Sequence, residues 1–200
     1  MFSSFVRLAG AMAAVLTVGL AHANSVVDTG TPPETLGWSF SNSQYFAGEF
    51  QLTSDSILDS IQGYFSTEPG AVDISIHANS GDVPGAILYT ASLATSSAAT
   101  DWNGLSNLDW SLGAGTYWVS FKPTFAASNF SSMPGAAPNP LTNYALGTGD
   151  YSWTNEGAIL AVGVRIDDTV AAPVPEPATI TMYAVGLLCL GVVGHRKLRS

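Results

Sequence analysis

Residues 113–121, with the sequence GAGTYWVSF, contain the clearest strand pattern of the chain. A turn bounded by two glycines opens it, and in the residues that follow, Tyr, Val and Phe alternate with Thr, Trp and Ser. Since successive side chains of a strand point to opposite faces, Tyr117, Val119 and Phe121 share one face and Trp118 lies on the other. The sequence therefore predicts a strand with one core face, and it leaves Trp118 on the outer face.

Short runs of similar character recur on both sides of this stretch, separated by Gly, Pro, Asn and Asp. They cover residues 36–41, 45–53, 57–65, 71–78, 87–93, 108–112, 116–122 and 159–166, with a weaker run near Tyr144. No convincing amphipathic helix and no repeat interrupts them. The pattern predicts an all-β fold, an antiparallel β-sandwich of eight or so strands. Residues 123–143 lack it and hold four prolines, which predicts a mobile loop, with a binding loop as the alternative.

Charged residues make up 10% of the chain, against about 25% in ordinary globular domains. Between Asn24 and Val174 the only basic residues are Lys122 and Arg165, against fourteen Asp and Glu. Such an acidic surface repels phosphate, so we expect neither nucleic acid nor anionic lipid as a partner of this domain. The single cysteine, Cys189, excludes an intrachain disulfide.

The N-terminal residues 1–23 have the three parts of a secretory signal peptide. Arg7 supplies a positive start, an apolar run follows, and Ala21 and Ala23 place small residues where signal peptidase needs them. A first transmembrane helix is the alternative, but the apolar run is short for one. We expect signal peptidase to cleave after Ala23, which leaves an ectodomain over residues 24–170.

The C-terminal residues 171–200 also divide into three parts. Proline-rich residues 171–177 predict an extended spacer, and the uncharged apolar residues 178–194 predict a single transmembrane helix of ~25 Å. A packed core helix is the alternative, but the polar residues lack helical spacing. The tail at 195–200 is basic, through Arg196, Lys197 and Arg199, which places it in the cytoplasm and the ectodomain outside.

The sequence Val-Pro-Glu-Pro-Ala-Thr at 174–179, the apolar segment and the basic end together resemble the PEP-CTERM sorting signal. The resemblance implies a Gram-negative host whose exosortase recognises Pro175, Glu176 and Pro177. The helix would anchor the protein in the inner membrane until it is processed near this motif. The product would then be displayed at the cell surface or secreted.

The ectodomain resembles the jelly-roll-like domains that often precede this tail. The resemblance rests on residues 36–38, 83–85, 102–105, 115–118 and 163–166, and it implies a fold without a known activity.

Candidates for catalysis are few. Asp73, Ser75 and His77 share one face of a strand, but neighbours two apart are separated by ~6.6 Å, beyond hydrogen-bond reach. We interpret them as the polar outer face of a half-buried strand. A carboxylate pair of a glycoside hydrolase remains open, because fourteen acids offer many pairs and single out none.

Two kinds of binding residue remain open as well. No cofactor is expected other than calcium, for which Asp82, Asp167 and Asp168 are the candidates, although no Asp-x-Asp-x-Asp loop occurs. Tryptophans stack on sugar rings when they are exposed, although they are more often core residues. The candidates are Trp102, Trp110, Trp118 and Trp153, and strand phase favours Trp118.

These observations favour an exported, exosortase-sorted protein of the cell surface or extracellular matrix, without catalysis and with exopolysaccharide as its expected ligand. Two alternatives stay open: a secreted glycoside hydrolase, and a purely structural or adhesive biofilm matrix protein.

Overall fold

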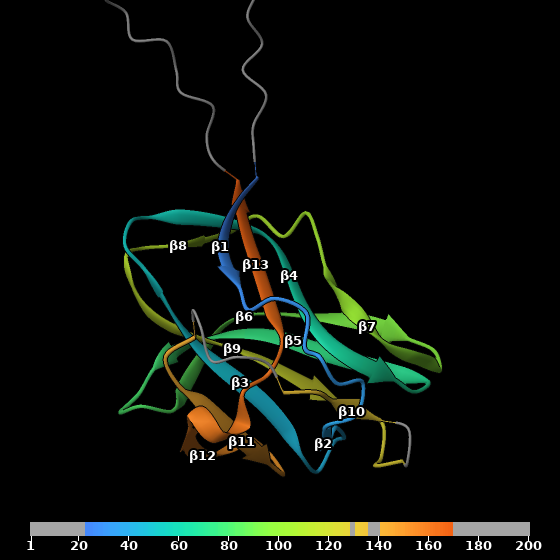
Figure 1. Cartoon of the computed structure of the whole chain (residues 1–200). Coiled ribbons are helices and arrows are strands. Elements are labelled where there is room, and N and C mark those ends of the chain that lie inside the picture. Colours follow the sequence, from blue (N-terminus) through green and yellow to red (C-terminus); the bar gives the residue numbers. More distant parts are fainter. Residues whose placement is uncertain (1–22, 129–130, 136–140, 170–200) are drawn as a thin grey trace, which may run out of the picture. The chain divides into compact units, whose positions relative to one another are not determined.

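The computed structural model describes residues 23–128, 131–135 and 141–169, within a compact unit at His22–Val170 (Figure 1). Its strands are β1 (Ala23–Asp28), β2 (Trp38–Ser39), β3 (Tyr45–Leu52), β4 (Ser56–Thr67), β5 (Gly70–Asn79), β6 (Pro84–Thr95), β7 (Ala98–Leu105), β8 (Trp110–Leu112), β9 (Gly115–Pro123), β10 (Ser132–Met133), β11 (Tyr144–Thr148), β12 (Ser152–Gly157) and β13 (Val164–Thr169). A 3₁₀ turn, η1 (Ala158–Leu160), precedes β13. All strand pairings of the described residues are antiparallel, so the expected all-β class is confirmed.

Two sheets enclose the core. One has the order β1-β13-β4-β7, with β8 also paired to β4, and the other has the order β12-β11-β3-β9-β5-β6. The described residues also form a third sheet of two strands, β10-β2. Leu58, Ile61 and Phe65 of β4 belong to the same buried cluster as Ile74 of β5 and Val119 of β9. This shared cluster makes the two large sheets the layers of a sandwich.

Strand β9 has the alternation that its sequence predicts. Val119 and Phe121 are fully buried in the core between the sheets, and Tyr117 packs against it. Trp118 points to the other face, as expected, but it is 0% exposed. Trp118 is therefore not accessible for stacking on a sugar ring, because Ala145 of β11 and Trp153 of β12 pack against it on the outer face.

The structure differs from the sequence prediction in three places. Strands β1, β7 and β12 were not predicted, since their polar residues obscure the alternation. The expected strand at 159–166 is divided into η1 and β13. Within 123–143, the described residues include β10 and the buried side chains of Phe125, Met133 and Leu141. These described parts are packed into the core, so the expectation of a mobile loop is wrong for them.

The first and last described strands are neighbours. Ala23 pairs with Thr169, so β1 begins where β13 ends (Figure 1). The predicted signal peptide and sorting tail lie outside the described residues, apart from Ala23, the first residue of β1. Within the part of the chain that the structure describes, no helix has the length and apolar character to cross a membrane.

Candidate functional site

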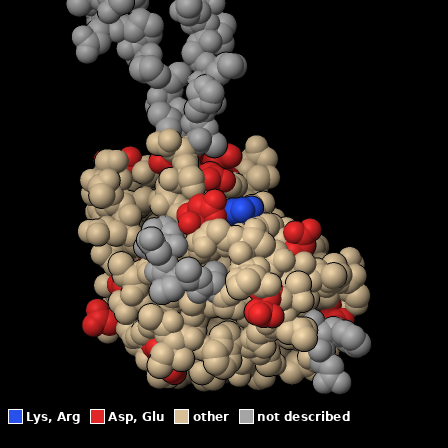
Figure 2. Space-filling view, in the orientation of Figure 1, with Lys and Arg blue, Asp and Glu red and all other residues tan. Residues whose placement is uncertain are grey.

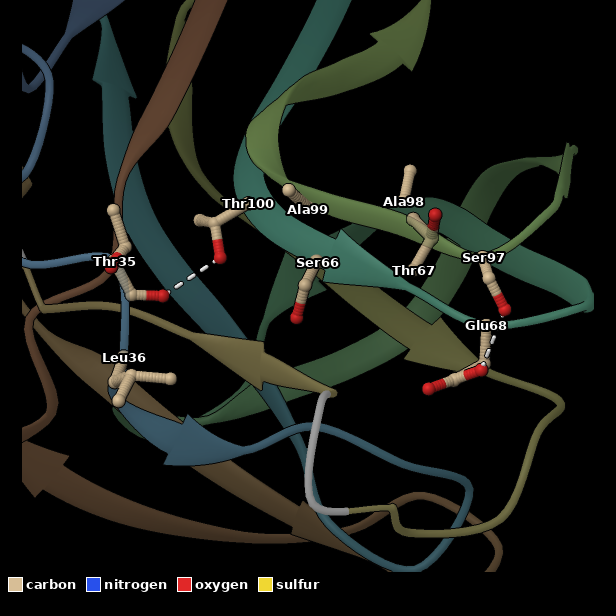
Figure 3. Close-up of a pocket in the computed structure, with 9 residues that line it drawn as sticks. All are labelled: Thr35, Leu36, Ser66, Thr67, Glu68, Ser97, Ala98, Ala99 and Thr100. Atoms are coloured by element: carbon tan, nitrogen blue, oxygen red, sulfur yellow. Dashed lines mark hydrogen bonds between the residues drawn. The ribbon is translucent and has the colours of Figure 1, made fainter.

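A groove of about 810 Å³ lies beside the end of β4 and the start of β7 (Figure 3). Its lining comes from three separate parts of the chain: Thr35 and Leu36, then Ser66, Thr67 and Glu68, then Ser97, Ala98, Ala99 and Thr100. Leu36 is 73% exposed, whereas Ser66 and Thr67 are buried. The groove therefore combines an accessible apolar side chain with hydroxyl groups, and its volume is within the ~300–1,000 Å³ of small-molecule sites.

Hydrogen bonds hold the two sides of the groove together. The Thr100 hydroxyl donates to the Thr35 carbonyl oxygen over 2.7 Å, and the Ser97 hydroxyl donates to Glu68 Oε2 over 3.0 Å (Figure 3). The other oxygen, Glu68 Oε1, accepts from Ser128 at 2.8 Å. Because both carboxylate oxygens are already held, the groove has a fixed carboxylate with lone pairs left for a further donor.

The chemistry of this lining suits recognition of hydroxyl-rich ligands. The hydroxyls of Ser66, Thr67, Ser97 and Thr100 already donate within the protein, so they and the Glu68 carboxylate can accept hydrogen bonds from the hydroxyl groups of a ligand. Glu68 is the one carboxylate among the lining residues. Hydrolysis of a glycosidic bond by the usual mechanism needs two carboxylates, so these residues alone do not supply that machinery.

The expected sugar-stacking tryptophans do not form one platform. Trp118 is buried, and its Nε1–H donates to Asn79 Oδ1 over 3.0 Å. Trp153 is half-buried, with its ring centroid 5.1 Å from that of Tyr45. Trp102 lies in the other sheet, where its indole N–H donates to Thr31. Trp110 is 8% exposed and stacks on Tyr89, so it belongs to the core.

A polar cluster is buried on the outer face of the six-stranded sheet. His77 is 0% exposed, with Nε2 2.8 Å from Ser120 Oγ and Nδ1 3.1 Å from the Gly85 carbonyl oxygen. A carbonyl only accepts, so in the neutral imidazole Nδ1–H donates to Gly85 and Nε2 accepts from Ser120. Burial lowers the pKa of His77, which favours this neutral form.

The expectation that Asp73, Ser75 and His77 form a half-exposed face is therefore only partly right. They share a face that is not the core face, but Ser75 and His77 are both fully buried. Burial also raises the pKa of Tyr151, and the negative charge of Asp73 adds to this rise while a hydrogen bond with Ser75 opposes it. A serine hydroxyl hydrogen-bonded to a histidine, as Ser120 is to His77, is the arrangement of a nucleophile and its base. Both side chains are buried, however, so a dissolved substrate does not reach them.

Both basic side chains of the domain are engaged. Lys122 Nζ lies 4.1 Å from the ring centroid of Tyr151 and 3.7 Å from a carboxylate oxygen of Asp150. The Arg165 guanidinium lies 3.9 Å from the ring centroid of Trp102, and its Nε donates to Asp28 over 3.2 Å. On the face shown in Figure 2, blue is confined to one small area beside red groups. The Arg165 guanidinium therefore covers one face of the Trp102 ring. Because each of the two basic groups lies beside a carboxylate, neither provides a positive patch that would attract an anionic polymer.

Of the three candidate calcium ligands, Asp82 lies in a turn, whereas Asp167 and Asp168 are neighbours in β13, where Asp168 Oδ1 is buried without a hydrogen-bond partner among the described residues. Asp82 has a φ of 63° in the β5–β6 turn, and its carbonyl oxygen accepts from Asn155. In β13, the Asp167 carboxylate accepts from Ser60 over 2.8 Å, and Asp168 is the next residue. No group of three or more His, Cys, Asp or Glu side chains that could hold a metal occurs among residues 23–128, 131–135 and 141–169.

Apart from Ala23, the residues expected to direct processing are outside the part of the chain that the structure describes. Ala21, the Pro175-Glu176-Pro177 motif, the apolar segment 178–194 and the basic residues Arg196, Lys197 and Arg199 lie outside the described residues.

The groove was missed because its residues carry no recognisable motif. Its three segments are about thirty residues apart, and Ser, Thr and Ala at 95–100 read as turn residues. The only local signal was the density of small hydroxyl residues, which does not by itself indicate a site. Comparison of the sequence with protein-family models finds no match, and comparison with curated proteins finds none either.

Proposed function

We propose that this chain is an exported protein that is sorted through its C-terminal tail and acts, without catalysis, in the extracellular polysaccharide matrix. The observation that carries the proposal is the order of the parts: a signal peptide, an all-β domain, then Pro175-Glu176-Pro177, an apolar segment and a basic end. In this proposal the domain is jelly-roll-like, signal peptidase and exosortase are the processing partners, and the inner membrane holds the precursor.

The placement of the groove supports display of a binding site. The Thr169 hydroxyl donates to the Ile57 carbonyl oxygen near the start of β4, whereas Ser66 and Thr67 of the groove are at its end. Ten residues of extended strand span roughly 33 Å. Thr169, the last described residue, thus lies near one end of β4, and the groove lies at the other.

The ligand class follows from the charges. The groove holds Glu68, its lining contains no Lys or Arg, and the surrounding domain is acidic. An anionic uronic-acid polymer would be repelled, whereas an uncharged polysaccharide offers hydroxyl groups to the Ser, Thr and Glu side chains. We therefore propose an uncharged exopolysaccharide as the ligand.

The test is retention of the purified full chain, in detergent, on an immobilised uncharged glucan and on a uronic-acid polymer. We expect retention on the glucan only, and a loss of about tenfold or more in affinity for Glu68→Ala together with Thr100→Ala, since each removes a polar group of the groove. The matched control is Glu156→Ala with Thr154→Ala, which changes the same residue types on exposed or partly exposed positions of β12. Equal retention of both double variants, or none by the wild type, would contradict binding in the groove and favour a purely structural role.

A further inference from the structure

The open edges of the two large sheets differ in how they are protected. Natural edge strands avoid pairing with other chains by being short, charged or bulged. Strand β1 has six residues, a register shift and Asp28, β7 carries Asp101, and β12 has six residues and Glu156. Strand β6 has twelve residues and no charge, and within the described chain it pairs with β5 alone (Figure 1).

The second half of β6 is a regular strand. Its pairing with β5 proceeds without a shift from Tyr89 opposite Ile76 to Thr95 opposite Gly70. The irregularities lie before this stretch, where Ile87 faces His77 and Leu88 is the additional residue. Along the seven residues from Tyr89 to Thr95, every second residue therefore points its backbone N–H and C=O groups away from β5, and these groups form an open edge in strand geometry.

The side chains of this stretch suit a further strand. Tyr89, Ala91 and Leu93 pack against the core but are only partly buried, so apolar surface remains open at the edge. Thr90, Ser92 and Ala94 alternate with them, are small and are exposed. A neighbouring strand would cover the apolar side chains on one face and would meet no bulky or charged group on the other.

We propose that β6 pairs with β6 of a second copy of this chain, antiparallel and through Tyr89–Thr95. A second copy fits this edge, because an antiparallel pair of identical Tyr89–Thr95 stretches places Thr90 of each copy opposite Ala94 of the other, so that no charged or bulky side chains meet on the exposed face. The same patch on both copies gives a closed two-fold contact.

The nearest carboxylate, that of Asp73 on β5, accepts a hydrogen bond from Ser92. In the dimer, the two Asp73 side chains would be separated by three strand spacings, ~14 Å, which exceeds the Debye length of ~8 Å at physiological salt. The contact joins the two six-stranded sheets into one continuous sheet of twelve strands.

The experiment is sedimentation of the full chain in density-matched detergent over a range of protein concentrations. We expect a monomer–dimer equilibrium that shifts toward the dimer as NaCl rises from ~0.05 to ~0.5 M, because salt screens the repulsion between acidic domains. Thr90→Glu with Ala94→Glu places like charges opposite or diagonal to each other across the contact, and should weaken dimerisation about tenfold or more. The control, Thr154→Glu with Ile159→Glu, adds the same charge at exposed positions off β6 and should dimerise as the wild type does.

A wild type that stays monomeric at all salt concentrations would overturn the proposal, and so would a dimer that persists unchanged in the β6 double variant. Hydrogen exchange of the wild type gives a second measurement that does not depend on how the variants fold. The amides of Tyr89–Thr95 that do not already pair with β5 should gain protection as protein concentration rises, and unchanged protection of these amides across the dimerisation range would also overturn the pairing.

Discussion

At the scale of single residues, Trp118 and Trp153 differ in the hydrogen bonding of their indole N–H groups. They pack against each other in one small cluster. Trp118 donates to Asn79 over 3.0 Å, whereas Trp153 Nε1 is buried without a hydrogen-bond partner among the described residues. Since a buried donor without a partner costs free energy, the two side chains contribute differently to stability.

Replacing each tryptophan with phenylalanine should separate these contributions. Trp118→Phe removes a satisfied hydrogen bond, leaves Asn79 Oδ1 without that donor and opens a cavity, so it should lower the free energy of unfolding by about 2 kcal/mol or more. Trp153→Phe removes the unpaired N–H and should change it by less than about 1 kcal/mol. Urea unfolding curves of the two variants measure the difference, and equal losses would contradict the hydrogen-bond assignment.

His77 makes stability depend on pH. Burial lowers its pKa in the folded protein below the ordinary value of about 6.5. As pH falls through that value, the unfolded chain takes up the proton first, so the free energy of unfolding should decrease below pH ~6.5. His77→Gln keeps polar groups at the position but does not titrate. The difference in unfolding free energy between wild type and variant should therefore change between about pH 7 and pH 5, and a constant difference would contradict the buried neutral histidine.

At the scale of elements, the outer face of the six-stranded sheet is covered in part by side chains from its own edge, the β11–β12 hairpin. Tyr45 is fully buried beneath it, and its hydroxyl accepts from the Tyr151 amide over 2.7 Å and donates to the Gly149 carbonyl oxygen over 3.0 Å. A Cβ at Gly147 of β11 would lie 2.1 Å from Tyr45 Cε2. The Tyr45 ring can therefore lie against β11 only with glycine at position 147.

Gly147→Ala should displace the hairpin or Tyr45 and lower the free energy of unfolding by about 2 kcal/mol, as overpacking does elsewhere. The matched control is Gly113→Ala, whose added Cβ meets only Asp55 Oδ1 at 3.6 Å, so its effect should stay within about 0.5 kcal/mol. Thermal denaturation compares the two variants, and a tolerated alanine at 147 would show that the hairpin is not held against Tyr45.

The hairpin also explains what the sequence could and could not predict. The alternation in 116–122 correctly assigns both faces of β9, because strand periodicity depends only on local geometry. The burial of Trp118 and His77 depends on the hairpin of β11 and β12, which joins the sheet through the pairing of β11 with β3 and is distant from β9 in the sequence. Long-range pairing of this kind leaves no local trace, so the outer face was predicted to be more exposed than it is.

At the scale of the whole molecule, the character of the two chain ends could be predicted from the sequence, whereas the groove could not. The expected processing signals at residues 1–23 and 171–200 are linear, so composition, the order of the parts and a family resemblance suffice to predict them. The groove requires residues near 35, 67 and 98 to meet, which only the sheet topology achieves. The pairing of Ala23 with Thr169 brings the first and last described residues side by side, and the expected cleavage after Ala23 would leave Asn24–Asp28 of β1 in place.

The most direct test of the sorting account is the mass and location of the mature protein in its host, for the wild type and for a variant with Pro175, Glu176 and Pro177 replaced by alanine. We predict a wild-type product that begins at Asn24, ends near the motif and leaves the membrane, and a variant that keeps its tail and stays membrane-bound. A tail that remains on the product in both strains would contradict the account, and would make residues 178–194 an ordinary membrane anchor.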